Sequence, residues 1–116
     1  MNTEQSLKQA EDLLATWNKE TSQPELSRLD AIISADDLRS CTKALHQAGW
    51  GYLSAITGVD LGPEAGQLEV LYHFCNGPAI TNLRVRQPRE TQVVVPSIAD
   101  ILPPASFFER ELQEML

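Results

Sequence analysis

The feature that most constrains the fold is a run of three apolar, alternating segments separated by two short turn signals. The segments span residues 52–60, 68–75 and 80–87, and glycine and proline concentrate in the turns at 61–66 and 76–78. Alternation of this length is typical of β-strands. Turns this short join neighbouring antiparallel strands, because a parallel pair needs a crossover of about a dozen residues. The sequence therefore predicts an antiparallel meander.

Alternation along the meander also predicts which side chains point into the core. The inward set is apolar and comprises Leu68, Val70, Tyr72, Phe74, Leu83 and Val85. The outward set is mixed and comprises Glu69, Leu71, His73, Cys75, Arg84 and Arg86. Opposite charges on adjacent strands tend to pair, so we expect Glu69 to bind an arginine across the sheet.

Two members of the outward set, Leu71 and Cys75, do not fit a face that is entirely solvated. Another element of the chain or a partner subunit that covers this face would account for them. Arginine is enriched in protein–protein contacts, and Arg89 follows Arg84 and Arg86 in this region. Three interpretations of this face therefore remain: another element of the chain covers it, a partner subunit covers it, or its charged residues simply pair across the strands.

Helical periodicity marks the first half of the chain. Apolar residues recur at helical spacing over residues 3–17, which predicts a first helix. A second helix is predicted to start at Ser34, where a hydroxyl precedes two acidic residues, and to end before Gly49 in the C′ position.

A third helix is predicted at the end of the chain, over residues 106–116. Ser106 is followed three residues later by Glu109, which is the pattern of a capping box. Its apolar stripe would comprise Phe108, Leu112 and Met115.

The order of elements predicts the fold class. A short strand over residues 29–33 follows a polar connector at 18–24, so the order is α-β-α-β-β-β-α. This order favours an α+β two-layer sandwich with a mostly antiparallel sheet and helices packed on one face. One domain accounts for the 116 residues, with a helix and connector (1–24), an α/β core (25–90), and an extended segment and C-terminal helix (91–116).

Composition narrows the functional classes. With 9 basic and 16 acidic residues the formal charge is −7, which argues against binding to nucleic acid or anionic lipid, because both need basic density. No window approaches the roughly 18 apolar residues of a membrane helix, and the N-terminus lacks the pattern of a signal peptide. Two cysteines form no disulfide framework, so a cytoplasmic location is the default.

The residues that could carry chemistry form no known metal or nucleotide pattern. Cys41 and Cys75 lack CxxC or Cys–His spacing, so we interpret both as small core residues. The glycines at 49–51 follow a helix instead of opening one, which argues against a phosphate-binding loop. We therefore expect no catalytic, cofactor-binding or metal-binding residue on this chain.

An alternative from another functional class is a small stand-alone enzyme that uses His73, Glu69 and Arg84 on the sheet. This alternative requires a concave site around the three side chains and a perturbed pKa of His73. Without those two properties, the three residues are cross-strand neighbours on a solvated face.

The C-terminal part of the chain resembles one family. Collinear similarity to the 30 kDa subunit (the C-subunit) of proton-pumping NADH:quinone oxidoreductase, or respiratory complex I, runs through residues 52–60, 68–74, 83–86 and 95–101. The triplet 109–111, followed by Glu114 and an apolar pair, resembles the start of that family's signature. Family members continue beyond this point, so a C-terminal truncation is expected.

The resemblance implies a non-catalytic scaffold subunit of the peripheral arm of the complex. It would support the quinone-site large (49 kDa-type) subunit and contact the neighbouring iron–sulfur subunit. It would carry no cofactor, and would lie at the cytoplasmic face of the cell membrane only through its partners. The expected interface residues are Glu109, Arg110, Glu111, Glu114, Arg84 and Arg86. The equivalent subunit of a membrane-bound hydrogenase, or of a related ferredoxin- or formate-linked complex, is the alternative.

Overall fold

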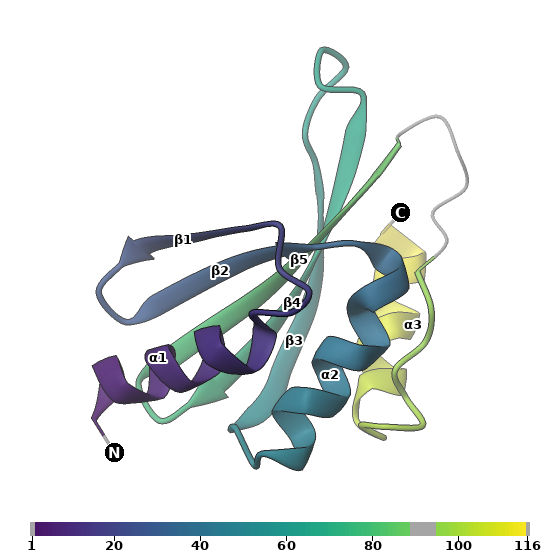
Figure 1. The fold of residues 1–116 in the computed structure, drawn as a ribbon. Coiled ribbons are helices and arrows are strands. Elements are labelled where there is room, and N and C mark those ends of the chain that lie inside the picture. Colours follow the sequence, from purple (N-terminus) through teal and green to yellow (C-terminus); the bar gives the residue numbers. More distant parts are fainter. Residues whose placement is uncertain (1, 89–94, 116) are drawn as a thin grey trace.

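The chain forms two layers, a mixed β-sheet and a layer of helices (Figure 1). The computed structural model describes residues 2–88 and 95–115. Over these residues the elements are α1 (Thr3–Leu14), β1 (Glu20–Glu25), β2 (Arg28–Ile33), the 3-10 helix η1 (Ala35–Asp37), α2 (Leu38–Gln47), β3 (Tyr52–Asp60), β4 (Gln67–Asn76), β5 (Ala79–Pro88) and α3 (Ala105–Met115). The predicted α+β class and order are confirmed, with one additional strand, β1.

The strands of the described chain form one sheet in the order β1-β2-β5-β4-β3. β2 and β5 are parallel, whereas all other neighbouring strands are antiparallel. The predicted meander corresponds to β3, β4 and β5, and its register places Val70 opposite Val85 and Glu69 opposite Arg86. Its antiparallel pairing is therefore confirmed.

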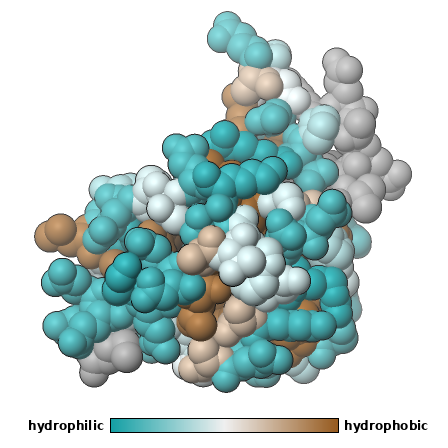
Figure 2. All heavy atoms as spheres, in the orientation of Figure 1, coloured by the Kyte–Doolittle hydropathy of each residue, from teal (hydrophilic) through white to brown (hydrophobic). Residues whose placement is uncertain are grey.

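The three α-helices of the described chain all pack on one face of the sheet. Their buried side chains form a single cluster with the inward residues of the strands; this cluster includes Leu14, Leu45, Val70, Tyr72, Leu83 and Leu112. Burying one such side chain contributes roughly 1.5–3 kcal/mol. Seen from the side of α1 and α2, the surface is mostly hydrophilic with scattered apolar groups (Figure 2). None of the described helices is both long and apolar enough to cross a membrane.

Strand β1 corrects the prediction of a connector at residues 18–24. All six of its residues are exposed, so the stretch has no inward apolar alternation from which a strand could be recognised. It forms because its backbone pairs with β2 at the edge of the sheet, from Glu20 opposite Ile32 to Glu25 opposite Arg28. A proline, Pro24, is tolerated in such an edge strand. Tertiary pairing here outweighs local propensity.

The start of the second helix also differs from the prediction. Ser34 Oγ donates to Asp37 Oδ2 (2.9 Å), so hydroxyl and carboxylate bind each other and form no capping box. The chain first makes the 3-10 turn η1 and becomes α-helical only at Leu38. Short 3-10 turns of this kind are common at the N-termini of α-helices.

Gly49 ends α2 in the predicted C′ position. Its φ is +66°, and two bonds of a Schellman motif close the helix, Gly49 N to His46 O (3.0 Å) and Trp50 N to Leu45 O (2.9 Å). The next residue, Trp50, is buried, and its indole Nε1 donates to the carbonyl of Ser6 (2.8 Å). This bond connects the end of α2 to α1.

Gly51 brings the start of β3 against the end of β4. Its φ is +61°, and a Cβ at this position would lie 2.0 Å from the carbonyl oxygen of Cys75. No other residue type fits this approach. The glycines at 49–51 thus have a structural explanation.

Candidate functional site

The face of the sheet opposite the helices carries a polar network, and we call it the open face. No helix of the described chain packs on it. The side chains at the centre of the open face come from β2 (Arg28, Asp30), β5 (Asn82, Arg84, Arg86), β4 (Glu69, Leu71, His73) and β3 (Thr57). Register explains the grouping, since Asp30 is opposite Asn82, which is opposite His73.

Asp30 is the centre of the network, and its side chain is 1% exposed. Arg28 donates to it through a two-bond fork, Nε to Oδ1 and Nη2 to Oδ2, both at 2.8 Å. Asn82 Nδ2 donates to Oδ1 (2.9 Å), and Arg84 Nη1 lies 3.3 Å from Oδ2. A carboxylate can be buried on a sheet face only with such partners.

Glu69 forms the second half of the network, and its side chain is 2% exposed. Arg84 donates to Oε1 through Nη2 (2.7 Å) and Nε (3.0 Å). Arg86 donates through Nε to Oε2 (2.9 Å). The predicted cross-strand pairing of Glu69 with an arginine is confirmed, and two arginines take part.

His73 extends the network toward β3. Its Nδ1 lies 2.7 Å from Asn82 Oδ1, and its Nε2 lies 2.8 Å from Thr57 Oγ1. Because the amide nitrogen of Asn82 donates to Asp30, its Oδ1 is the acceptor and Nδ1 of His73 carries the proton. Hydrogen bonds therefore run without interruption from β2 to β3.

The surroundings of Asp30, Arg28 and Arg84 favour the ionised form of each side chain. Burial raises the pKa of Asp30, but hydrogen bonds from Arg28 and Asn82 and the charges of Arg28 and Arg84 outweigh it, so the pKa lies below its ordinary value. The hydrogen bond to Asp30 raises the pKa of Arg28, and the bonds to Glu69 raise that of Arg84. A carboxylate held in this way is a poor proton acceptor near neutral pH.

Leu71 and Cys75, the two residues of the outward set that do not fit a fully solvated face, both lie on the open face. Leu71 is buried in register between Arg84 and Thr57. Cys75 is half-buried, with its Sγ 3.5 Å from Ser54 Oγ, so its interpretation as a core residue is wrong. Cys41, by contrast, is fully buried in the core, and burial raises the pKa of its thiol to about 12.

The charged residues of α3 lie in a separate place, on the helix side of the sheet. Glu109 turns inward: its Oε1 accepts from the backbone N–H of Ile98 (2.8 Å) and its Oε2 from Ser97 Oγ (2.8 Å). The predicted capping box is therefore wrong, and Ser106 Oγ donates instead to the carbonyl of Pro103 (3.1 Å). The further residues of the triplet and its neighbourhood, Arg110, Glu111 and Glu114, are exposed.

Glu109 is one of two clamps on the turn that precedes α3. Ile98 is fully buried in this turn. Arg39 of α2 forms the second clamp, donating to the carbonyl of Ser97 (2.6 Å) and to both carboxylate oxygens of Asp100 (2.7 Å each). The hydrogen bond from Arg39 lowers the pKa of Asp100 to about 2.

The structure thus divides the predicted interface residues into two groups. Arg84 and Arg86 belong to the open face, whereas Glu109, Arg110, Glu111 and Glu114 lie on α3. Arg89, the side chain of Met115 and Leu116 fall outside the residues that the structure describes.

Sequence reasoning missed Arg28, Asp30, Asn82 and Thr57 as members of the network. Arg28 and Asp30 have an i, i+2 spacing that places both on one face of a strand. That signal becomes useful only once β2 is known to lie beside β5.

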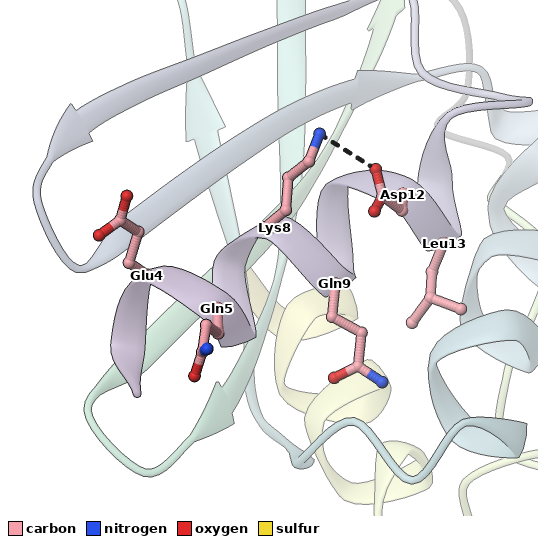
Figure 3. A pocket seen from close by; sticks show the side chains of 6 residues that line it. All are labelled: Glu4, Gln5, Lys8, Gln9, Asp12 and Leu13. Carbon is pink, nitrogen blue, oxygen red and sulfur yellow. Dashed lines mark ion pairs between the residues drawn. The ribbon is translucent and has the colours of Figure 1, made fainter. Parts of the chain in front are cut away.

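A shallow depression elsewhere does not involve these residues. It is lined by Glu4, Gln5, Lys8, Gln9, Asp12 and Leu13, all from α1, with Lys8 and Asp12 paired at 3.2 Å (Figure 3). This depression is the solvent-facing side of α1 and not an enclosed pocket. Within residues 2–88 and 95–115, no three His, Cys, Asp or Glu side chains gather as a metal site would require.

The fold and the open face define a class of protein: a two-layer α+β domain whose sheet buries an arginine–carboxylate network on the face without helices. Residues 31–116 match the family described as respiratory-chain NADH dehydrogenase, 30 Kd subunit. The chain belongs to this family, which confirms the resemblance seen in its sequence.

Two curated relatives illustrate the similarity. The NADH-quinone oxidoreductase C-subunit of Ruegeria pomeroyi is 30% identical over 107 residues, which cover 78% of this chain and 54% of the relative. The corresponding C-subunit of Moorella thermoacetica is 30% identical over 87 residues, covering 73% and 58%. The chain thus spans little more than half the length of these relatives.

Two solved structures share the fold. A chain of the membrane-bound sulfane sulfur reductase, an archaeal respiratory membrane complex, superposes with a TM-score of 0.76 at 23% identity over 93% of this chain and 65% of its own. The trypsin-resistant fragment (1-134) of Nqo5 superposes with a TM-score of 0.68 at 21% identity over 100% and 92%.

Proposed function

We propose that this chain is a scaffold subunit in the peripheral arm of a proton-translocating NADH:quinone oxidoreductase. In this role it supports the quinone-site large (49 kDa-type) subunit and contacts the neighbouring iron–sulfur subunit. The observation that carries the proposal is the family match over residues 31–116. The protein then lies at the cytoplasmic face of the membrane and is attached through its partners.

The polar network supports a structural role over a catalytic one. A general base or nucleophile needs a group that can change its protonation or its bonding during the reaction. Asp30 and Glu69 are each held by two arginines, and the depression described above lies on α1. This arrangement gives no support to the stand-alone enzyme that would use His73, Glu69 and Arg84.

The proposed role places cofactors on the partner subunits. Purified chain should therefore show no visible flavin or iron–sulfur absorption and no protein-bound iron by elemental analysis. A stoichiometric iron or flavin content that survives gel filtration would contradict this part of the proposal.

The test of the function is affinity purification of the tagged full chain from its native cells, followed by mass spectrometry. The expected partners are the quinone-site and NADH-binding subunits of one complex. Recovery of a nickel-site hydrogenase subunit instead would assign the chain to a membrane-bound hydrogenase. Recovery of ferredoxin- or formate-linked subunits would assign it to those complexes, and recovery of no respiratory subunit would remove the proposal.

A further inference from the structure

We propose that β1 is a protective edge strand: it covers the outer edge of β2, and its own residues keep the strands of a second copy of this chain from pairing with it. β1 is the outermost strand on its side of the sheet (Figure 1). This property concerns self-association of the chain and is independent of the proposed function.

Without a neighbour on its outer side, β2 would be a template for strand addition. One side of β2 pairs with β5, and its side chains Leu29, Ala31 and Ile33 are buried under the helices. An unpaired strand edge presents a row of free N–H and C=O groups, and apolar, β-branched residues favour further pairing. β1 removes this template because it pairs antiparallel with β2 along that side.

β1 adds almost nothing to the hydrophobic core. All six of its residues are exposed, including Thr21, which lies opposite the buried Ala31. The strand contains no Val, Ile, Leu, Phe, Tyr or Trp. Apolar burial therefore stabilises β1 little, because that free energy is proportional to the area removed from water. What β1 supplies is backbone pairing with β2, which indicates a role at the edge of the sheet.

Three features of β1 act against the addition of a further strand. Pro24 has no N–H to donate to a neighbouring backbone. The register against β2 shifts between Ser22 and Glu25, and a bulge of this kind bends and twists a strand locally. Glu20 and Glu25 place exposed charges at both ends of the strand. Proline, bulges and charged side chains are the features by which natural edge strands avoid pairing with other chains.

The opposite edge of the sheet differs from β1 in all but the bulge. β3 is the outermost strand there, and α3 lies next to it. Its residues 52–59 contain no charged residue and no proline. The proline and the charges thus occur on the edge strand whose residues are all exposed, where the protection has to come from the strand itself.

The experiment removes the protective residues from the full chain. The test variant combines Pro24→Thr with Glu20→Gln and Glu25→Gln, which restores a backbone N–H and removes both charges. Analytical ultracentrifugation of the purified chain measures the self-association constant. Amide hydrogen exchange then locates the new contact, and circular dichroism reports whether the variant is folded.

The matched control combines Pro63→Thr with Glu64→Gln and Glu4→Gln. It makes the same three substitutions at exposed positions of the β3–β4 loop and of α1. Both variants therefore lose the same charge, so a general weakening of repulsion between chains would affect them equally.

We expect the test variant to self-associate about tenfold more tightly than the wild type, because a backbone hydrogen bond is restored and exposed charges are removed. Amide protection should increase in β1, and the control should behave as the wild type does. A folded test variant that associates no more than the control would overturn the inference, as would association without added protection in β1. Should the triple variant be unfolded, Pro24→Thr alone decides the question, with Pro63→Thr as its control.

Discussion

At the residue scale, the role of Asp30 depends on partners that lie far away in the sequence. Arg28 is a local neighbour, but Asn82 and Arg84 come from β5. Leaving a buried charge without such partners costs several kcal/mol. Asp30 is therefore the side chain at which the network is most sensitive to substitution.

We expect Asp30→Asn to lower the free energy of unfolding by about 2–3 kcal/mol. This lies below the roughly 3–5 kcal/mol typical of a broken buried pair, because Arg28 and Arg84 are partly exposed and solvent compensates them. Urea denaturation followed by circular dichroism measures the change. The control is Asp12→Asn, which breaks an exposed pair with Lys8 and should leave the free energy of unfolding almost unchanged, because solvent screens exposed ion pairs. Equal effects of the two substitutions would contradict the assignment.

The lowered pKa of Asp30 gives a pH dependence with a definite sign. The folded protein binds a proton at Asp30 less readily than the unfolded chain does. Its contribution to stability is therefore complete above the ordinary carboxyl range near about pH 4, and is lost as the pH falls through the lower folded-state pKa. The difference in unfolding free energy between wild type and Asp30→Asn should shrink below about pH 4. A difference that stays constant down to about pH 2 would speak against this linkage.

At the scale of elements, α3 and the turn before it form one unit. Glu109 of α3 binds the turn at Ser97 and Ile98, and Arg39 of α2 binds it at Ser97 and Asp100. The first residue of the family-like triplet thus maintains the shape of the segment, while Arg110 and Glu111 remain available to a neighbour. The triplet therefore combines one residue that stabilises the turn with two residues that are exposed to a neighbour, and the sequence pattern does not distinguish the two roles.

Removing the charge of Glu109 should loosen this unit. We expect Glu109→Gln to reduce stability by about 1 kcal/mol, because it weakens charge-assisted bonds at a half-buried site. Native-state amide exchange at Ile98 should accelerate about fivefold. The matched substitution Glu111→Gln changes the same charge at an exposed position of the same helix and should leave exchange at Ile98 unaltered. Similar acceleration in both variants would contradict the clamp.

At the scale of the whole molecule, two of the charged surfaces formed by the described residues lie on opposite sides of the sheet. One is the open face, and the other is the exposed side of α3 with Arg110, Glu111 and Glu114. A scaffold that contacts two neighbours needs two separate surfaces. This arrangement supports the proposed contacts with both a large subunit and an iron–sulfur subunit.

The α3 surface is tested by exchanging its charges. The double substitution Arg110→Glu with Glu111→Lys leaves the net charge unchanged, so a loss of assembly would report the position of the charges. We expect recovery of the large subunit to fall roughly tenfold while the isolated chain stays folded. Lys8→Glu with Glu11→Lys exchanges a similarly exposed pair on α1 and serves as the control. Unchanged assembly of the α3 variant would remove α3 from the interface.

Part of the candidate site could be predicted because it follows from alternation. Period-two patterning places Glu69 and Arg86 on one side of their strands, and the short turn between β4 and β5 brings those strands together. The contribution of Asp30 could not be predicted in this way, since nothing local places β2 beside β5. The inward turn of Glu109 was hidden for a similar reason, because its partner Ile98 lies in the preceding turn and not in its own helix.

The amino-acid sequence by itself determined the meander, the helical stripes, the end of α2 at Gly49 and the family. These depend on periodicity, turn chemistry and motifs, which act over a few residues. Tertiary structure decided that β1 is a strand, that Asp30 and Glu69 share Arg84, and that Glu109 faces inward. The physical reason is that backbone pairing and buried charge take their partners from anywhere in the chain. The intramolecular ion pairs and hydrogen bonds of the folded chain therefore determine which charged side chains remain available to another protein.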